Sequence, residues 1–270
     1  MSLRSMRYRV YSDYFMPCRM NEYKDLVEKF VCQGYETHSI ISFWRLLVSG
    51  ADVTKGKYLL LRHDVDINPA AAEEMWRIEQ DLGAKSSFYF RLSTMDLELM
   101  KRIEDSGSEA SYHYEEIATI IKQRRLRTKD DVLKCMPEIQ QLFWQNYTCL
   151  KRKSGLPMAS VASHGDFTNR ILGIPNWYLL QSSDLRKKLG IEVETYDRKL
   201  MTYVISRHSD ALYPDLWKPN NPEDAIIQGA SVVYILTHPC RWKRSVALRI
   251  RHDITRLVEG FNYHVFRGSV

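Results

Sequence analysis

The chain has no long apolar run, and this absence excludes one class of protein. No segment of its 270 residues comes near the roughly 18 consecutive apolar residues that a membrane-spanning helix needs. The opening stretch, MSLRSMRYRVYSDYF, also lacks the apolar region of a secretion signal. We therefore expect a cytoplasmic protein without a membrane span.

Cysteine is scarce, and its spacing disfavours two kinds of structure. The five cysteines are Cys18, Cys32, Cys135, Cys149 and Cys240. Their number is odd, they are widely scattered, and no two of them form a CxxC pair. A disulfide framework and a cysteine zinc site are therefore both disfavoured, and we expect reduced thiols.

The excess of positive charge is modest and is not concentrated in one region. The net charge is +6, and the basic residues form only short clusters within residues 122–129, 151–153 and 241–244. No zinc-finger, RNP or helix-turn-helix pattern accompanies them, so we expect no nucleic-acid partner. A hydrophobic content of 44% is enough for a sizeable core, so the chain is not expected to be disordered.

Short apolar runs alternate with helical periods along the middle of the chain. The expected strands span residues 58–66, 85–91, 108–114, 158–166, 191–197, 201–207 and 230–239. Strand, helix and strand at this spacing predict parallel βαβ units. We expect one distorted (β/α) barrel of about seven parallel strands, with a doubly wound open sheet as the alternative.

No linker rich in glycine, serine or proline divides the chain, so we expect a single domain with three parts. Residues 1–50 are expected to form a helical lead-in, residues 51–245 the catalytic barrel, and residues 246–270 a C-terminal extension packed on it. No internal repeat or low-complexity stretch suggests a further division.

Residues typical of helix ends support the expected helices. Asn68 and Pro69 suit the start of a helix after the first strand of the barrel. Thr128 and Asp131 have the spacing of a capping box before a long helical stretch. Pro137 is expected to kink or split that stretch, because proline disrupts the interior of a helix.

Polar residues stand where the expected strands end. Asp64 and Asp66 end the first of these strands, His113 ends the third, His164 follows MASVAS, and His238 ends VVYILT. In parallel β/α folds the carboxyl ends of the strands lie together, and chemistry gathers there. Four separate strands that each deliver an aspartate or a histidine to this edge predict a functional site.

The spacing within HDVD indicates what that site holds. Residues two apart on a strand share a face, so Asp64 and Asp66 point the same way while His63 points the other way. Two carboxylates on one face repel each other unless a cation lies between them or one stays protonated. A divalent ion resolves this repulsion, and one carboxylate with two imidazoles suits a catalytic zinc-type site.

Taken together, these motifs resemble those of a known family. The stretch LRHDVDINPAAAEEMWRIEQDLGAKSSFYFR, followed by GSEASYHYE, SHGDF and LTHPCRW, is similar to the polysaccharide deacetylases with a NodB homology domain, which are carbohydrate esterase family 4-like. The similarity is to an uncharacterised bacterial branch whose first motif reads HDVD. It covers residues 59–242, most of the chain. The resemblance implies a distorted β/α barrel and metal-dependent removal of acetyl groups from sugars.

The resemblance also implies roles for individual residues. Asp64 falls where the family has its catalytic base and Asp66 where it has a metal-binding aspartate, although the inserted Val65 leaves open which aspartate is which. His113 matches the first histidine of the family's HxxxH pair, and His238 matches the late histidine that assists as general acid. The implied cofactor is one divalent metal ion, zinc first, with cobalt, nickel and manganese as alternatives.

The sequence departs from the family pattern in two places. The family's Arg-Pro motif is not recognisable, and the second histidine of HxxxH is replaced by Ile117. We expect His164 of SHGDF to serve as the missing ligand, with Glu115 and Glu116 as reserves.

Four further residues border the predicted site. Arg91 is a candidate for holding a substrate anion or orienting the base, with a plain ion pair as the alternative. Trp242 is a candidate for stacking on a sugar ring, with a structural role as the alternative. His63 is expected either to contact the metal ligands from outside the ligand group or to have a structural role. Asp166 is expected either to orient His164 or to cap the next turn.

The leading hypothesis is a metal-dependent hydrolase that removes N- or O-linked acetyl groups from a carbohydrate, so the expected partner is an acetylated sugar or glycan. A second hypothesis keeps the site and changes the substrate to a non-sugar amide or cyclic ureide, as in allantoinase-like relatives. The missing HxxxH histidine favours a third, a barrel without catalytic activity that binds a glycan or a protein partner. The intact Asp64, Asp66, His113 and His238 argue against the third hypothesis.

Overall fold

A curled β-sheet forms the centre of the molecule. The computed structural model describes residues 3–181 and 183–265. The strands are β1 Glu36–His38, β2 Tyr58–Val65, β3 Ser87–Phe90, β4 Glu109–Tyr114, β5 Ser160–Ser163, β6 Val193–Glu194, β7 Ser206–Asp210, β8 Trp217–Lys218 and β9 Val232–Thr237. They run in the order β6-β5-β4-β3-β2-β9-β7-β8, and β1 pairs with the first residues of β2.

The sheet is that of a distorted (β/α) barrel, which confirms the fold predicted from the sequence. β2 pairs in parallel with β3 and β9, and parallel pairing continues through β4, β5 and β6 on one side and β7 on the other. Only the short β8 runs antiparallel among the described strands, at the edge next to β7. No ladder joins β6 to β7 or β8 within the described residues, so the sheet forms a curled half-barrel.

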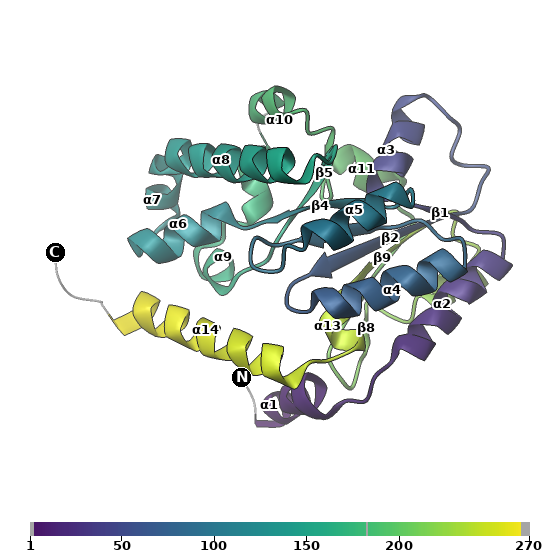
Figure 1. Cartoon of the computed structure of the whole chain (residues 1–270), viewed down its shortest axis with the longest axis horizontal. Helices are drawn as coiled ribbons and strands as arrows, with labels where there is room; N and C mark the ends of the chain where they lie inside the picture. Colours follow the sequence, from purple (N-terminus) through teal and green to yellow (C-terminus); the bar gives the residue numbers. More distant parts are fainter. Residues whose placement is uncertain (1–2, 182, 266–270) are drawn as a thin grey trace.

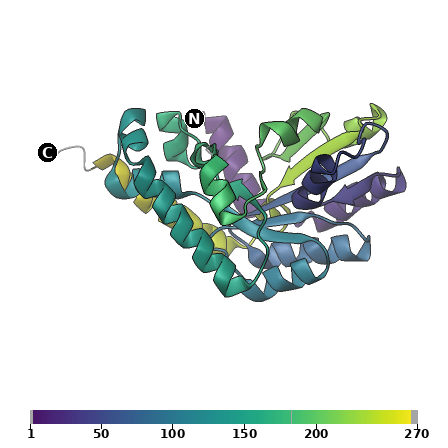
Figure 2. The same cartoon turned by 90° about the horizontal axis from the view of Figure 1, so that it is seen from above.

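Helices pack around this half-barrel, most of them on its outer side (Figure 1, Figure 2). They are α1 Leu3–Val10, η1 Tyr11–Phe15, α2 Met20–Cys32, α3 Ile40–Val48, α4 Pro69–Asp81, α5 Leu97–Asp105, α6 Glu116–Arg124, α7 Lys129–Lys134, α8 Met136–Ser154, α9 Phe167–Leu172, η2 Asn176–Leu180, α10 Ser183–Leu189, α11 Arg198–Tyr203, α12 Glu223–Ile227, α13 Pro239–Trp242 and α14 Val246–Val265. The helices therefore leave the concave side of the sheet as the place where strand-end side chains meet.

The alternation of side chains along β2 decides which of them reach that concave side. Leu59 and Leu61 belong to the main core beneath the outer helices, whereas Leu60 belongs to a smaller cluster on the inner face with residues of α3. Because successive strand residues point to opposite faces, Arg62 and Asp64 follow Leu60 to the inner face. The whole strand is buried apart from its first residue, so both polar side chains enter a closed environment.

The helix ends carry the signals that the sequence predicts. The side chain of Asn68 accepts a hydrogen bond from the first turn of α4 at 3.3 Å, and Pro69 is the first residue of that helix. Thr128 accepts a hydrogen bond from Asp131 N at 3.1 Å at the start of α7. Pro137 lies in the first turn of α8, so the long helical stretch is split there, as predicted.

One predicted strand begins too early. We predicted a strand over residues 201–207, but Tyr203 and the residues before it belong to α11, and β7 begins at Ser206. Asp197 caps α11 by accepting a hydrogen bond from Lys199 N at 3.0 Å, which favours a helical turn at that point. A short apolar run does not by itself distinguish a helix from a strand.

The two ends of the described chain pack against each other. Tyr14 of η1 donates a hydrogen bond to Asp253 of α14 at 2.6 Å, and Arg249 of α14 pairs with Asp13. α14 runs along one side of the molecule beside α1 (Figure 1). None of the helices in the described ranges is long and apolar enough to cross a membrane.

Candidate metal centre and active site

The five polar residues predicted from strand ends lie together at the carboxyl edge of the sheet. Asp64 is the next-to-last residue of β2, and Asp66 follows that strand directly. His113 lies near the end of β4, His164 follows β5, and His238 follows β9. Because these strands are parallel, their carboxyl ends meet at one edge, and the five side chains converge there.

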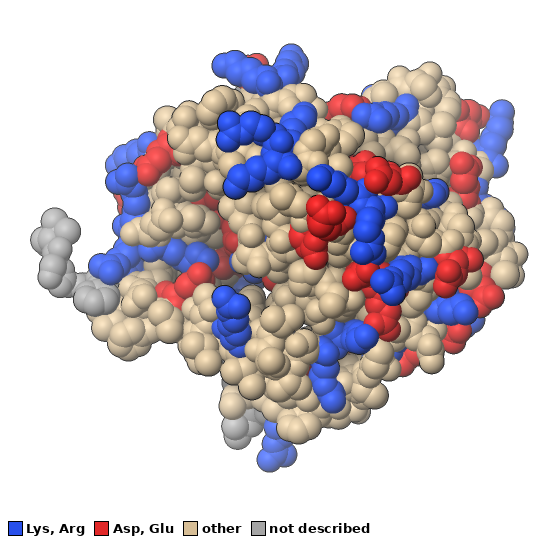
Figure 3. All heavy atoms as spheres, in the orientation of Figure 1, with Lys and Arg blue, Asp and Glu red and all other residues tan. Residues whose placement is uncertain are grey.

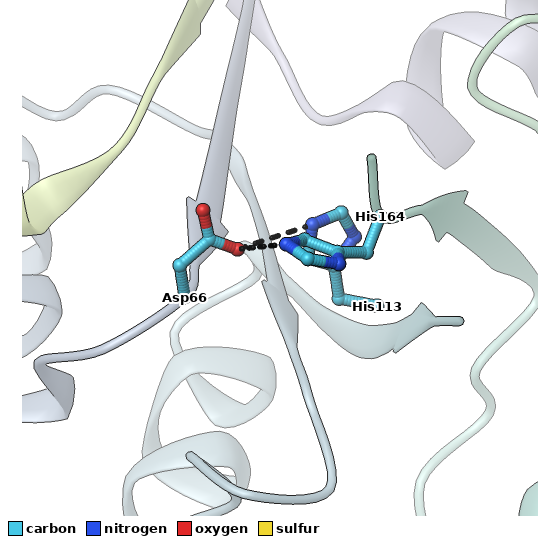
Figure 4. A group of neighbouring side chains, drawn as sticks. All are labelled: Asp66, His113 and His164. Carbon is cyan, nitrogen blue, oxygen red and sulfur yellow. Dashed lines mark ion pairs between the residues drawn. The ribbon is translucent and has the colours of Figure 1, made fainter. Parts of the chain in front are cut away.

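Asp66, His113 and His164 form a group with the composition of a metal site (Figure 4). Their nearest ligand atoms all lie within 4.8 Å of one another. Asp66 Oδ1 is 3.4 Å from His113 Nε2 and 3.7 Å from His164 Nε2. Ligands about 2.1 Å from a tetrahedral zinc ion lie about 3.4 Å from each other. The spacing therefore fits one divalent ion.

The hydrogen bonds around the group also fit a cation. Asp66 Oδ1 is buried and has no hydrogen-bond partner, which is unusual for a buried carboxylate oxygen. His113 Nδ1 lies 3.0 Å from Ala162 O, and because a carbonyl only accepts, this nitrogen carries the proton. In the neutral ring, His113 Nε2 therefore presents its lone pair toward the two aspartates, as a metal ligand requires, and without an ion the same nitrogen binds a proton and pairs with these carboxylates.

Glu115, which the sequence analysis names only as a reserve ligand, lies beside His164. Glu115 Oε2 lies 3.2 Å from His164 Nδ1, although the two atoms are not aligned as in a hydrogen bond. Arg91 binds Glu115 through two nitrogen–oxygen contacts of 2.7 and 2.8 Å from its Nη2. Arg91 therefore forms an ion pair, which is the alternative to a role in substrate binding that the sequence analysis gives. Glu115 is placed to orient His164 rather than to replace it.

Two residues near His164 have other partners than the predicted ones. The side chain of Asp166 caps α9 by accepting hydrogen bonds from Thr168 N and Oγ1 at 2.9 and 2.8 Å. Of the two roles predicted for Asp166, capping agrees with these contacts. Glu115 is therefore the better candidate for orienting His164. Glu116 points away and binds Tyr112 Oη at 2.5 Å. Ile117 is buried in the main core.

Asp64 is held by an arginine that the sequence analysis did not single out. Arg62 Nε and Nη2 donate to the two oxygens of Asp64 at 2.7 and 2.8 Å, and both side chains are buried. Burial opposes ionisation of Asp64, but Arg62 and His113 outweigh it and lower the pKa of Asp64 below its usual value. The signal was present in the sequence, because Arg62 stands two residues before Asp64 and so shares its face.

His238 is oriented by a second residue that the sequence analysis missed. Asp210, the last residue of β7, accepts from His238 Nδ1 and from its backbone N–H, both at 2.7 Å. This leaves His238 Nε2 facing the site, 3.9 Å from Asp66 Oδ2. Arg241 also binds Asp210 at 2.9 Å. Asp210 lies beyond the strand predicted over residues 201–207, so no strand-end signal in the sequence marked it.

Trp242 does not have the role of a sugar platform. Its side chain is only 2% exposed, so it offers no face to a ligand. It packs edge-on against Tyr23 and beneath Arg19, and its ring N–H donates to Asp210 at 3.1 Å. The structural alternative is therefore correct, and through Asp210 the indole helps to fix His238.

His63 lies on the opposite face of β2, as the alternation predicts. Its Nε2 is 2.7 Å from Glu79 Oε1 and its Nδ1 is 2.6 Å from Thr237 Oγ1. Both His63 and Glu79 are fully buried beneath α4 and α2, away from the concave side. Of the two roles considered for His63, the structural one agrees with this position.

The titratable groups of the site stabilise one another's charged forms. Burial opposes ionisation of Asp66, but His164, His113 and His238 hold its pKa well below the usual range. Burial lowers the pKa of His113, yet the facing carboxylates of Asp64 and Asp66 outweigh it and raise that pKa overall. Without an ion, this edge of the sheet is therefore a network of charged pairs.

Comparisons with known proteins give only distant structural likenesses. No protein-family model matches the chain, and no curated protein matches it either. The structure of the Streptococcus pyogenes deacetylase PplD in complex with acetate is similar, with 11% sequence identity, a TM-score of 0.44, and 93% of this chain and 92% of that chain covered. A mutant of BA3943, a CE4-family pseudoenzyme with restored enzymatic activity, is similar with 15% identity, a TM-score of 0.37, and 76% and 63% coverage. At these values neither likeness assigns a function to this chain.

Proposed function

We propose that the chain is a metal-dependent hydrolase that removes N- or O-linked acetyl groups from a carbohydrate. The observation that carries the proposal is the buried oxygen of Asp66, which has no hydrogen-bond partner and lies between the imidazoles of His113 and His164. Asp64 and His238 flank this group and are placed for acid–base work. The choice of an acetylated sugar rests on the resemblance of the sequence motifs to polysaccharide deacetylases.

Asp66, His113 and His164 would hold the ion, and Glu115 would keep His164 in its ligand orientation. A divalent ion at this position supplies Lewis acidity, which activates water at neutral pH and polarises a carbonyl group. Zinc is our first choice because two imidazoles and one carboxylate are typical of its catalytic sites. Cobalt, nickel and manganese remain the alternatives to test.

Asp64 is our candidate for the general base. Arg62 keeps its pKa low, so the carboxylate is charged across the neutral range and available to accept a proton from the attacking water. Its position supports this role, since Asp64 Oδ2 lies 3.5 Å from His113 Nε2, at the edge of the proposed metal group. The bidentate contact with Arg62 also fixes the direction in which the carboxylate points.

His238 is our candidate for the general acid. Asp210 binds its Nδ1, so the other ring nitrogen, Nε2, faces the site and donates a proton to the leaving nitrogen or oxygen of the sugar. Asp210 stays ionised to do this, because Arg241 and His238 outweigh the effect of burial and lower its pKa. Asp64 and His238 each approach a different member of the proposed ligand group, His113 and Asp66, which supports separate roles as base and acid.

The proposal is tested by metal loading followed by a substrate screen. The purified protein is stripped with a chelator, reloaded with zinc, cobalt, nickel or manganese, and assayed for acetate release from acetylated chito-oligosaccharides and nucleotide sugars. We expect one metal per chain and acetate release that a chelator abolishes. Release from a non-sugar amide alone would favour the allantoinase-like hypothesis. Glycan binding without any acetate release, with the metal in place, would favour the binding-only hypothesis.

A further inference from the structure

The outward side of α14 carries an apolar stripe, with the polar residues Arg251, Thr255, Asn262 and His264 exposed beside it. Its exposed apolar residues follow a spacing of three or four, so they form a single stripe on one side of the helix. They are Val246 (44% exposed), Ile250 (45%), Ile254 (56%), Leu257 (73%), Val258 (53%), Phe261 (61%) and Val265 (54%). Contiguous exposed apolar surface of this kind marks an interaction site more often than scattered single residues do.

The inward face of the same helix carries ion pairs and one buried aromatic ring, that of Tyr263. Arg249 pairs with Asp13 and Asp253, and Glu259 pairs with Lys122 at 2.8 Å. A helix on the surface of a globular protein normally buries its apolar stripe and exposes its charges. α14 leaves most of its apolar residues exposed, and it is attached to the body through these ion pairs and through Tyr263, which is buried in the main core.

The N-terminal helices add to this surface. Met6, Val10, Tyr11 and Phe15 of α1 and η1 are 53%, 41%, 41% and 66% exposed. η1 contacts α14 through the hydrogen bond from Tyr14 to Asp253. We call the apolar residues of α1, η1 and α14 together the terminal-helix surface.

The exposed charges of these helices all have one sign. Arg4 and Arg7 of α1 and Arg251 of α14 are exposed. The acidic residues within residues 3–15 and 246–265, all of which the structure describes, are engaged in ion pairs, as given above for Asp13 and for α14. In Figure 3 the lower part of the face shown, where α1 and α14 lie in Figure 1, is mostly uncharged, with scattered Lys and Arg and a few acidic residues.

We propose that the terminal-helix surface docks on the surface of an anionic lipid bilayer. An apolar helical stripe accompanied by arginines is the combination that binds at the boundary between headgroups and acyl chains. Arginines near the bilayer add attraction to anionic headgroups. A second copy of the chain would bring the exposed arginines of both copies together without opposing acids, so the charge favours the bilayer. This proposal does not depend on the proposed activity.

The experiment is co-sedimentation of the protein with vesicles of phosphatidylcholine alone or of phosphatidylcholine with one third phosphatidylglycerol. We expect binding to the anionic vesicles, little binding to the neutral ones, and a decrease as the salt concentration rises. Reversing Arg4 and Arg251 together, Arg4→Glu with Arg251→Glu, should weaken binding by at least about fivefold for each arginine. The double variant Leu257→Glu with Phe261→Glu should weaken it on the order of 100-fold.

The matched control is Ile227→Glu, because Ile227 is 84% exposed but lies on α12, outside the terminal-helix surface. This variant should bind like the unmodified protein, and thermal unfolding checks that every variant is folded. Equal binding to neutral and anionic vesicles, or binding to neither, overturns the proposal. A stable dimer would also overturn the proposal, if light scattering detects it without lipid and the double variant Leu257→Glu with Phe261→Glu dissociates it. The terminal-helix surface would then bind a second copy of the chain.

Discussion

The two faces of strand β2 each carry a cluster of imidazole and carboxylate side chains. The two clusters are similar in composition but differ in whether all of their polar atoms have hydrogen-bond partners. On the outer face, His63 lies with Glu79 beneath α4, and on the inner face, Asp64 and Asp66 lie with His113. Both clusters combine imidazole and carboxylate groups, and only Asp66, whose side chain is 19% exposed, is less than fully buried among these five residues. Composition and burial alone would therefore not tell which of them is functional.

The difference lies in the hydrogen bonds. In the outer cluster both nitrogens of His63 have partners, and Glu79 is bound by His63 and Tyr23 at one oxygen and by Ser86 at the other. In the inner cluster Asp66 Oδ1 is buried without any partner. Since buried polar atoms are normally paired, the complete cluster is explained by stability, whereas the incomplete one has an acceptor oxygen open to a ligand or a water molecule. The predictions below test this distinction, from the largest expected effect to the smallest.

Removing the unpartnered carboxylate should have the largest effect. Asp66→Ala should abolish stoichiometric metal binding and reduce acetate release on the order of 10⁴-fold, because the Lewis acid is worth several kcal/mol. Elemental analysis of the dialysed protein and an acetate assay measure the two effects. An Asp66→Ala variant that still holds one metal per chain would show that the ion, if any, lies elsewhere.

Removing the arginine-bound carboxylate should separate catalysis from metal binding. Asp64→Asn should reduce the turnover number about 10²- to 10⁴-fold while keeping the metal, because it removes a base and no ligand. The same elemental analysis and assay apply, with Asp66→Asn as the paired variant. Loss of metal in Asp64→Asn and retention in Asp66→Asn would mean that the two aspartates have the opposite roles.

A substitution in the outer cluster should lower the stability of the fold and leave metal binding unchanged. His63→Ala leaves a cavity and removes one partner of Glu79, so it should lower the free energy of unfolding by about 3 kcal/mol. Urea unfolding measures this loss. Metal content at a temperature where the variant is folded should be unchanged, and a large drop in metal affinity would contradict the separation of the two faces.

Two acid-to-amide substitutions near His164 should show which carboxylate orients its imidazole. Glu115→Gln should weaken metal binding about 10- to 100-fold, the usual effect of losing the group that orients a ligand histidine. Asp166→Asn is the matched control, since asparagine also caps a helix well and Asp166 is occupied with α9. Competition with a chromophoric chelator measures both affinities. Equal weakening in the two variants would mean that Glu115 has no special role.

The smallest effect is expected at a carboxylate outside both clusters. Burial raises the pKa of Glu104 to about 7, and its Oε1 accepts one hydrogen bond from Ala110 N at 3.0 Å. A raised pKa means that the stability it contributes is present below the ordinary pKa of 4.5 and is lost as the pH rises through about 7. Glu104→Gln keeps an acceptor without the charge. The variant should therefore gain stability relative to the unmodified protein as the pH rises from 5 to 8, as measured by urea unfolding. A difference in unfolding free energy that stays constant over this range would contradict the raised pKa of Glu104.

The sequence was informative where the fold is regular. Strand and helix alternation predicted the barrel, and because parallel strands bring their carboxyl ends together, it also predicted that residues as distant as Asp64 and His238 would meet. Alternation along β2 correctly placed His63 on the other face from the two aspartates. Their roles in metal binding and catalysis stay proposals.

The sequence was uninformative where a partner comes from a distant segment. Asp210 ends SRHSD, a strand without a clear apolar pattern, so nothing local linked it to His238. Whether Trp242 is exposed depends on Arg19 and Tyr23, which pack over it from the other end of the chain. The face of α14 that points outward likewise depends on ion pairs with distant residues such as Lys122.

The central claim is that the unpartnered oxygen of Asp66 marks a metal site, and anomalous diffraction tests it most directly. Crystals grown with zinc and measured on both sides of the zinc absorption edge should show one strong peak per chain, bonded to Asp66 Oδ1, His113 Nε2 and His164 Nε2. A structure in which this position holds no anomalous peak at saturating zinc, or in which a water molecule satisfies Asp66 Oδ1 instead, would contradict it.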